Sequence, residues 1–339
     1  MKRKLFCFVS LMFVFLTVKG QQEPNVLRYY MKNGTTFDVK ITELDRLQKV
    51  NNIGMNNVYN NGKQPKSILF SQIDSIVFLY VELPSGNNVN RNTNPDAMRL
   101  EFPHLKSGSD QLLVTHSTKE YGVTFSLEWD CSKRSQRWTC YQFHDGIPDN
   151  NVGRTGTWKD DPNIPKAYQT HSSEYSGTGY SRGHMCMSDD RQSSTEQNAQ
   201  TFYISNAHPQ YQNHNGFLWL SLENKVNGWG NNSSFRDTLY VVKAGTIDKP
   251  EQLLAPTNTG LLVPKYMYMA VLCYKGGNYK AIAFWTEHSN QKITNANLSQ
   301  YAISVRELEE RTGIDFFCNL PDDTEAQVEA ELKLADWSL

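Results

Sequence analysis

Apolar and polar residues alternate near the start of the chain in the pattern of half-buried β-strands. Phe37, Val39 and Ile41 alternate with polar positions, and a second apolar run covers residues 68–83. Such alternation gives a strand one apolar and one polar face, because successive side chains point to opposite sides. Residues 21–83 are therefore predicted to form a small β-rich domain, to which the sequence assigns neither a role nor a partner.

A polar stretch rich in asparagine interrupts this pattern. Residues 84–97 read PSGNNVNRNTNPDA, with a proline near each end. That composition is typical of a linker. We therefore expect a domain boundary here, followed by a second and larger domain over residues 98–339.

The second domain mixes strand and helix patterns. Short β-branched or aromatic runs typical of strands occur at residues 123–129, 239–242, 263–272 and 280–285. Ser304 and Glu307 form a capping box that opens a helix, and Gly313 can close it. A last helix is expected over residues 324–334, after an acidic pair that suits a helix start. Because strands and helices do not alternate regularly, the predicted class is α+β.

The first 20 residues have the pattern of a secretory signal peptide. Residues 2–4 are basic, residues 5–18 are apolar, and Gly20 ends a small-residue cleavage site. The apolar run is too short for a spanning helix, and no later segment is apolar enough to cross a bilayer. We expect cleavage after Gly20 and export, either by secretion or to the periplasm.

Removal of this segment would change the charge of the chain. It carries four of the 34 basic residues and none of the 35 acidic ones, which leaves a formal net charge of −5. The mature chain thus lacks the strongly basic composition typical of nucleic-acid-binding domains.

Five cysteines follow this segment, none at a spacing typical of zinc ligands. In an oxidising compartment we expect one or two disulfides with one thiol left over, and the sequence leaves their connectivity open. The five are Cys131, Cys140, Cys186, Cys273 and Cys318.

Candidate chemistry is concentrated in the segment YSRGHMCMSDD. Here Arg182, Gly183 and His184 place a permanent cation beside an imidazole. Residues 201–205 favour a strand, which we expect to pair with the strand that ends at His184. Taken alone, Arg-Gly-His is also compatible with a solvated surface loop, because single short motifs carry a high false-positive risk.

A helix is expected to begin at residue 213 or 214, after Pro209, and to end near residue 228. Its apolar stripe repeats every four residues, at Leu218, Leu222 and Val226. A neighbouring stripe holds Asn215 and Glu223 two turns apart. An amide oxygen and a carboxylate on one helix face are suited to a hard cation.

Together these residues form a series of motifs. The series consists of Arg-Gly-His at 182–184, Asn-x-x-Pro-Gln at 206–210, Asn215, Trp219 and Leu222-Glu223. In residue type and spacing it resembles the DNA/RNA non-specific endonucleases, which are ββα-metal (His-Me finger) nucleases. The resemblance extends from about residue 100 to residue 323 and is close to secreted members from Bacteroidetes-type bacteria. Ser181 and Met187 depart from the family pattern, which often has Asp and Pro at these places.

The resemblance implies a metal-dependent endonuclease that hydrolyses phosphodiester bonds of DNA and RNA. His184, titrating near neutrality, would act as the general base. Asn215 would hold one Mg²⁺, and the same amide-and-water site is compatible with Mn²⁺ or Ca²⁺. Glu223 would orient metal-bound waters, and Arg182 would contact the phosphoryl oxygens.

Arg154, in the segment GRTGTWKDDP, and Asn206 are further candidates for contacts with the substrate. Because these groups address the nucleic-acid backbone and not base edges, cleavage is expected to tolerate any sequence. The preference between DNA and RNA stays open, as does a homodimer.

One alternative is an exported nucleic-acid- or partner-binding protein on a catalytically weakened nuclease fold. Such a protein would have lost the motif histidine or the metal-holding asparagine, and this chain has both. An adhesion or polysaccharide-binding role would rest on the N-terminal domain alone.

Overall fold

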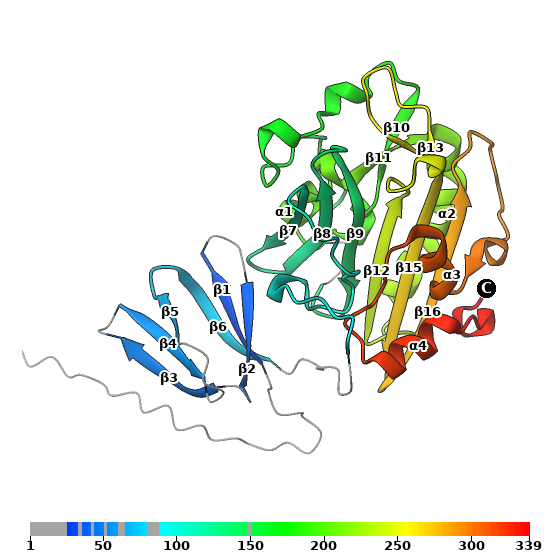
Figure 1. Cartoon of the computed structure of the whole chain (residues 1–339). Coiled ribbons are helices and arrows are strands. Elements are labelled where there is room, and N and C mark those ends of the chain that lie inside the picture. The colour runs from blue at the N-terminus through cyan, green and yellow to red at the C-terminus, as the bar shows by residue number, and fades with distance from the viewer. Residues whose placement is uncertain are drawn as a thin grey trace, which may run out of the picture. The chain divides into compact units, whose positions relative to one another are not determined.

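A computed structural model of the chain describes residues 26–32, 36–41, 44–50, 53–59, 65–79, 88–147 and 151–339 (Figure 1). The chain divides into two compact units, Met1–Leu83 and Pro84–Leu339. The predicted signal peptide lies outside the described residues. No described helix combines the length and the apolar character needed to cross a membrane.

The first unit consists of β-strands, as its alternating pattern predicts. One antiparallel sheet has the order β2 (Thr36–Lys40), β1 (Val26–Met31) and β6 (Ile73–Leu79). A second has the order β3 (Leu44–Val50), β4 (Gly54–Tyr59) and β5 (Lys66–Leu69). Leu27, Tyr29, Val39 and Ile68 form its buried core.

The second unit is built on a seven-stranded antiparallel sheet (Figure 1). The strand order is β17 (Ala302–Ile303), β16 (Asn278–Glu287), β15 (Tyr266–Lys275), β12 (Thr238–Gly245), β9 (Ser135–Phe143), β8 (Gly122–Asp130) and β7 (Gln111–Thr118). The strand expected at 263–272 is divided, because β14 (Val263–Pro264) pairs with β13 (Leu253–Leu254) before β15 begins.

The sheet separates two cores, because neighbouring residues of each strand face opposite sides. On one side Val241 of β12 packs with Leu222 and Val226 of helix α2 (Leu220–Gly230). On the other side Val242 packs with Leu308 of α3 (Val305–Thr312) and with α4 (Asp322–Ala330). Figure 1 shows α3 and α4 against the sheet from the side opposite α2. The short helix α1 (Thr195–Gln200) lies near β7.

Helix α3 follows its sequence signals. The Ser304 side chain accepts a hydrogen bond from the Glu307 backbone N–H at 3.1 Å, and Gly313 ends the helix with a φ of 75°, which favours glycine. Helix α4 differs from the expected 324–334, because it starts at Asp322 and the chain becomes extended at Glu331. The acidic residues at 322 and 323 thus lie inside its first turn, where they face the positive end of the helix dipole.

The asparagine-rich stretch is part of the second unit from residue 88 onward, which corrects its prediction as a linker. Asn88 Nδ2 donates to the Cys318 carbonyl at 3.0 Å, and Asn92 Nδ2 donates to the Pro103 carbonyl at 3.1 Å. The Asn92 backbone N–H also donates to Asn319 Oδ1 at 3.1 Å. A composition that suits a linker therefore serves here to satisfy backbone groups of the larger unit.

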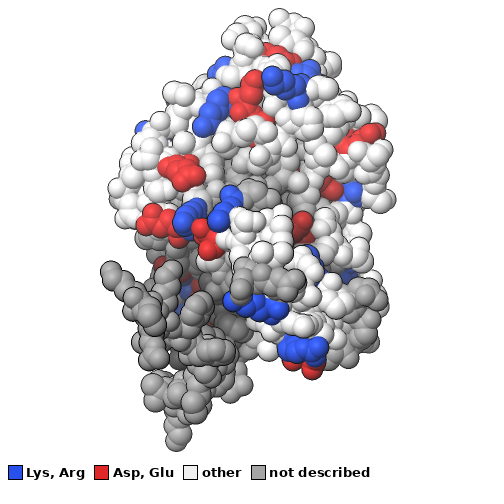
Figure 2. Space-filling model, turned by 90° about the vertical axis from the view of Figure 1, so that its left-hand side faces the viewer, with Lys and Arg blue, Asp and Glu red and all other residues white. Residues whose placement is uncertain are grey.

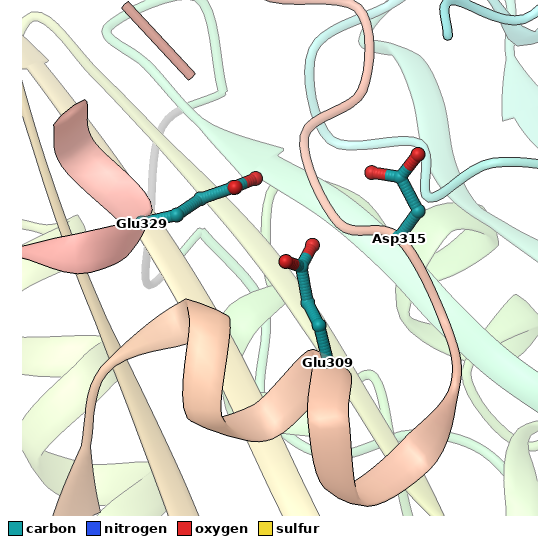
Figure 3. A group of neighbouring side chains, drawn as sticks. All are labelled: Glu309, Asp315 and Glu329. Carbon is teal, nitrogen blue, oxygen red and sulfur yellow. The ribbon is translucent and has the colours of Figure 1, made fainter. Parts of the chain in front are cut away.

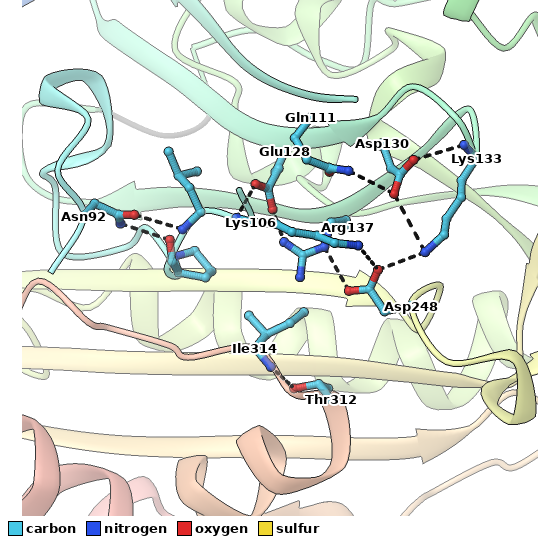
Figure 4. Close-up of polar contacts among 12 residues, drawn as sticks. Asn92, Lys106, Gln111, Glu128, Asp130, Lys133, Arg137, Asp248, Thr312 and Ile314 are labelled. Atoms are coloured by element: carbon cyan, nitrogen blue, oxygen red, sulfur yellow. Dashed lines mark hydrogen bonds and ion pairs between the residues drawn. The ribbon is translucent and has the colours of Figure 1, made fainter. Parts of the chain in front are cut away.

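A buried ion-pair network connects β8 and β9 to the loop after β12 (Figure 4). Arg137, which is 6% exposed, pairs with Glu128 and donates through Nε to Asp248 at 2.9 Å. Lys133 reaches the same Asp248 carboxylate at 3.0 Å. Because every charge here has a partner, the network is a structural feature of the fold.

The structure contains none of the expected disulfides among its described residues, where all five cysteines named above are buried free thiols. Cys131 and Cys140, which are close in sequence, belong to the cores on opposite sides of the sheet. The sheet therefore separates this pair.

Candidate active site

The Arg-Gly-His motif lies in a two-stranded antiparallel ribbon. Strand β10 (Tyr180–His184) pairs with β11 (Ala207–Tyr211), and His184 stands opposite Ala207. The prediction that residues 201–205 form the partner strand is wrong, because these residues form a turn, an isolated parallel bridge from Tyr203 to Lys159 and the start of a 3-10 helix, Ile204–Asn206. Pro209 is inside β11, where an edge strand tolerates its missing N–H.

The ribbon continues directly into the helix that completes a ββα unit. His214–Trp219 form a π-helical turn, and α2 follows without a break (Figure 1). The helix expected from residue 213 or 214 is thus confirmed, although its first turn is wider than an α-helical turn. Buried His214 anchors this turn, with Nε2 3.1 Å from Thr286 Oγ1.

Gly183 is required by the close approach of β11. A Cβ at this position would lie 1.9 Å from Oε1 of Gln210 and 2.3 Å from its Cδ. Gln210 is fully buried, so it has little room to move. The glycine between the cation and the imidazole therefore allows the two strands to pair this closely.

His184 is a buried, neutral imidazole. Its ring packs on Trp158 at 4.3 Å between centroids and meets Phe202 edge-on at 5.0 Å. Burial, followed by the charges of Arg154 and Lys243, lowers its pKa to about 3. The expectation that His184 titrates near neutrality is therefore wrong for the free protein. Its Nε2 is buried without a hydrogen-bond partner in the described structure, and its Nδ1, which has no partner there either, is not fully buried and can face a ligand.

Two arginines lie near this histidine. Arg182 donates to the Ser172 carbonyl at 2.7 Å, while its Nε is buried and unpartnered. The guanidinium of Arg154 lies 4.8 Å from the centre of Phe202, the ring that also contacts His184. Both arginines therefore retain N–H groups that can donate to an anion.

Glu223 lies on α2 in a buried charge network that the sequence did not reveal. Its Oε1 is 3.4 Å from Nζ of Lys243 on β12, and Lys243 is also 3.7 Å from Asp190. The Tyr141 hydroxyl donates to Asp190 at 2.6 Å. Burial raises the pKa of Glu223 to about 7, Lys243 opposes this shift, and Asp190 adds to it.

A single lysine within the apolar run of β12 is the signal that could have identified Lys243. The strand reads TLYVVKAG, and Lys243 is fully buried on the same side as Val241. A lysine is almost never fully buried unless a carboxylate pairs with it. The position of Lys243 in an apolar strand therefore indicates a buried acidic partner.

Asn215 fits a role as a metal ligand. It lies in the π-helical turn, it is partly exposed, and its amide has no hydrogen-bond partner among the described residues. A neutral amide oxygen with a carboxylate further along the same helix is a donor set that hard divalent cations accept.

Asn206 is engaged within the protein, which contradicts its prediction as a substrate contact. It is fully buried, and its Oδ1 accepts from the Cys186 N–H at 2.8 Å. Its Nδ2 donates to the carbonyls of Cys186 and Thr201, both at 2.8 Å. Asn206 therefore fixes the chain just beyond His184.

Comparison with known proteins gives a consistent result. The family model described as DNA/RNA non-specific endonuclease matches residues 111–323. A nuclease of Nostoc sp. is 28% identical over 218 residues, which cover 61% of this chain and 76% of that protein. The mitochondrial nuclease EXOG of Xenopus laevis is 28% identical over 214 residues, which cover 59% of this chain and 58% of that protein.

A solved structure shows the same fold. The crystal structure of the EndoG/EndoGI complex matches with a TM-score of 0.53 and 20% identity, covering 64% of this chain and 91% of the matched chain. The matched family region contains the β10–β11 ribbon, the π-helical turn and α2, which together carry the site. The chain therefore belongs to the DNA/RNA non-specific endonuclease family.

Proposed function

We propose that this protein is a metal-dependent endonuclease that hydrolyses phosphodiester bonds in DNA and RNA. The observation that carries the proposal is His184, whose imidazole has a lowered pKa and ring nitrogens without a hydrogen-bond partner in the described structure, two positions after Arg182 on the same strand. A phosphodiester is anionic, so attack by water requires a base and a positive charge directed at the phosphoryl oxygens. The ββα unit carries both.

His184 takes the proton from the attacking water through Nδ1, the ring nitrogen that is not fully buried. Its low pKa in the free protein keeps the ring in the acceptor form throughout the neutral range. Contact with the phosphate anion favours the protonated ring once the proton has moved. Arg182 and Arg154 donate N–H groups to the phosphoryl oxygens, and guanidinium groups remain charged at any working pH.

Asn215 and Glu223 are the residues that would hold the divalent cation. Bound there, Mg²⁺ supplies positive charge that stabilises the developing charge on the phosphate and the leaving oxygen. The Asn215 amide oxygen would be the direct ligand, and the ionised Glu223 carboxylate would accept hydrogen bonds from water at the site. Mn²⁺ or Ca²⁺ suits the same oxygen donors.

The charges on the surface are compatible with local binding of a polyanion. On the face drawn in Figure 2, lysine and arginine lie beside aspartate and glutamate and do not form one continuous basic surface. Substrate binding would therefore depend on the few cations at the site and would weaken as salt increases. Contacts limited to phosphates would give cleavage without sequence preference.

The pattern of residues 1–20 supports export as part of this proposal, with cleavage after Gly20 and a secreted or periplasmic location. Expression of the full chain in a bacterial host tests it. N-terminal sequencing should show that the exported protein begins at Gln21. A protein that stays in the cytoplasm and keeps its first 20 residues would contradict export.

Cleavage of two substrates tests the activity. Mature protein is incubated with supercoiled plasmid and with single-stranded RNA, each with Mg²⁺, Mn²⁺, Ca²⁺ or EDTA. We expect both substrates to be cut internally with at least one cation and to stay intact in EDTA. If the nucleic acids are bound but remain intact under every condition, the protein is a binding protein on this fold.

A further inference from the structure

A second group of carboxylates lies on the other side of the sheet from His184. Glu309 belongs to α3, Glu329 to α4, and Asp315 to the segment between the two helices. One carboxylate oxygen from each lies within 4.8 Å of the others. Figure 3 shows the three side chains directed toward a common space.

Two further side chains close this group. Asn90 Nδ2 donates to Asp315 Oδ2 at 3.0 Å and to Glu325 Oε1 at 2.9 Å. Glu309 Oε1 accepts from the Phe316 backbone N–H at 2.8 Å. The group therefore joins four carboxylates to one amide, and Asn90 brings in the asparagine-rich segment that precedes the sheet.

Glu329 has the Glu309 carboxyl group as its hydrogen-bond neighbour, but its Oε1 has no donor among the described residues. It is only 5% exposed, and its Oε1 is buried without a hydrogen bond in the described part of the chain. In Figure 3 its carboxylate points toward Glu309 and Asp315. Arg306 is close enough to affect this carboxylate, but its Nη2 donates to the Ala326 carbonyl at 2.8 Å. A buried carboxylate oxygen without a donor is costly, so the group has a place for a positive charge.

The raised pKa values of these carboxyl groups are consistent with a place for a positive charge. Burial is the largest cause that raises the pKa of Glu309 to about 7, of Glu325 to about 8 and of Glu329 to about 9. The neighbouring carboxylates raise the pKa of Glu329 further. Without a cation, these groups therefore avoid mutual repulsion by keeping protons.

We propose that Glu309, Asp315 and Glu329 bind a calcium ion, independently of the nuclease centre. All the donors are oxygens, which selects a hard cation over zinc or copper. Calcium accepts six to eight oxygens in irregular arrangements, whereas magnesium requires a regular octahedron and keeps much of its water. Carboxylates that come from two helices and a connecting segment form an irregular arrangement, which calcium accepts.

Asn90 supplies a further ligand by rotation of its amide. Its Oδ1 is buried and unpartnered, while its Nδ2 faces the two carboxylates. The two ends of an amide are nearly equal in size, so a half-turn about the terminal bond brings the oxygen to the cation and costs no space. The calcium ion then fixes the segment around Asn90 to α3 and α4.

Thermal unfolding of the full chain tests this site separately from the nuclease centre. The Asn215→Ala variant is the parent for all measurements, because it removes the direct ligand of the other site. Glu329→Gln is compared with Glu310→Gln, in which the neighbouring exposed glutamate of α3 is changed. Each protein is unfolded in EDTA, in CaCl2 and in MgCl2 at pH 8.

Calcium should separate the variants. In EDTA at pH 8, Glu329→Gln should unfold close to the temperature of its parent, because the raised pKa of about 9 keeps Glu329 protonated and glutamine is a neutral side chain of similar shape. In CaCl2 at about 100 times the Kd, the parent and Glu310→Gln should gain about 5–10 °C, and Glu329→Gln should gain little. Isothermal titration with CaCl2 should give one binding event in the parent that is lost in Glu329→Gln.

Two results would overturn the proposal. One is a calcium-induced shift of equal size in Glu329→Gln and Glu310→Gln. The other is the absence of any calcium-induced shift or binding heat in the parent. A shift produced by MgCl2 alone would contradict the assignment to calcium. None of these readouts depends on cleavage, so they do not test the proposed nuclease activity.

Discussion

Nζ of Lys243 lies 3.4 Å from Oε1 of Glu223, and the two side chains are 0% and 6% exposed. Lys243 comes from the middle of the sheet, whereas Glu223 comes from the helix that packs on it. Desolvation favours the protonated form of the glutamate, and the lysine charge favours the ionised form. The pair therefore sets the pH at which Glu223 could accept hydrogen bonds from water at the proposed metal site.

Replacement of this lysine should move the acid limb of the activity profile. In Lys243→Met the pKa of Glu223 should rise above its present value of about 7, because the opposing charge is lost while burial and Asp190 remain. Activity at pH 7 should fall by about fivefold for the first unit of that rise and by about tenfold for each further unit, and it should recover at higher pH. The kcat/KM for plasmid cleavage between pH 6 and 10 measures the shift. Lys275→Met, which alters an exposed pair with Asp237, serves as the control.

If the acid side of the pH–activity profile is unchanged in Lys243→Met, ionisation of Glu223 does not limit the reaction. A change in the pKa of His184 is not expected to shift this profile in the variant. Lys243 contributes to its low pKa, but burial is the larger cause and remains.

Loss of His184 should remove most of the turnover. His184→Ala should lower kcat by about 10²–10⁴-fold, the usual contribution of a positioned acid–base group. Metal binding, measured by titration calorimetry, should stay close to that of the parent because the imidazole is not a proposed ligand. His104→Ala, which changes an exposed histidine of the same unit, should cut like the parent. Equal activity of the two variants would place the base elsewhere.

Asn215→Ala should behave differently from the histidine variant. Loss of the amide oxygen should weaken Mg²⁺ binding, so that part of the activity returns as Mg²⁺ is raised. Glu223→Ala should lose about 10–100-fold, the usual effect of a group that acts through water at a metal site. Titration of activity against Mg²⁺ separates these cases. If Asn215→Ala bound Mg²⁺ normally while His184→Ala did not, the two roles would have to be exchanged.

Buried histidines should make the second unit sensitive to acid. Burial lowers the pKa of His208 to about 3, although an unfolded histidine titrates near 6.5. Between these values the unfolded chain binds more protons than the folded one, so stability falls as the pH decreases from about 6.5. Above about 6.5 this contribution is constant.

His208→Leu should isolate this effect, because it removes the titrating group from both states. Relative to the parent, its free energy of unfolding in urea should improve as the pH falls from 7 to 5. The gain should reach about 1.4 kcal/mol for each pH unit below 6.5. A difference between variant and parent that does not change with pH would contradict the assigned proton uptake.

The sequence predicted a shared unit for the site residues that are close together along the chain. The structure places His184 and Asn215 in one ββα unit, and their roles stay predictions. Lys243 was missed because its relation to Glu223 depends on which side of β12 meets α2, and a strand's pattern does not specify its partner. The role of Asn206 was misjudged for a similar reason, since its hydrogen bonds to Cys186 form only after the two strands pair.

Two errors in the fold prediction have a common physical origin. Pro209 was read as a break, but the position opposite Arg182 in a two-stranded ribbon does not need its N–H. The stretch that contains Asn88 was read as a linker, but its amides satisfy carbonyls more than 200 residues away. In both cases the conformation that the local sequence favours was outweighed by the chain segment packed or bonded against it, which lies elsewhere in the sequence.

The wide turn His214–Trp219 decides the direction in which Asn215 points. In a regular α-helix, eight residues advance the chain by about 2.2 turns, which would rotate Asn215 roughly 80° away from Glu223. A turn that contains about one residue more cancels most of this rotation. Deletion of one residue from this turn would therefore leave the apolar stripe of α2 in phase with the sheet while swinging the amide around the helix axis. The direction of the Asn215 side chain around the helix axis and the packing of α2 on the sheet are thus encoded by separate stretches of sequence.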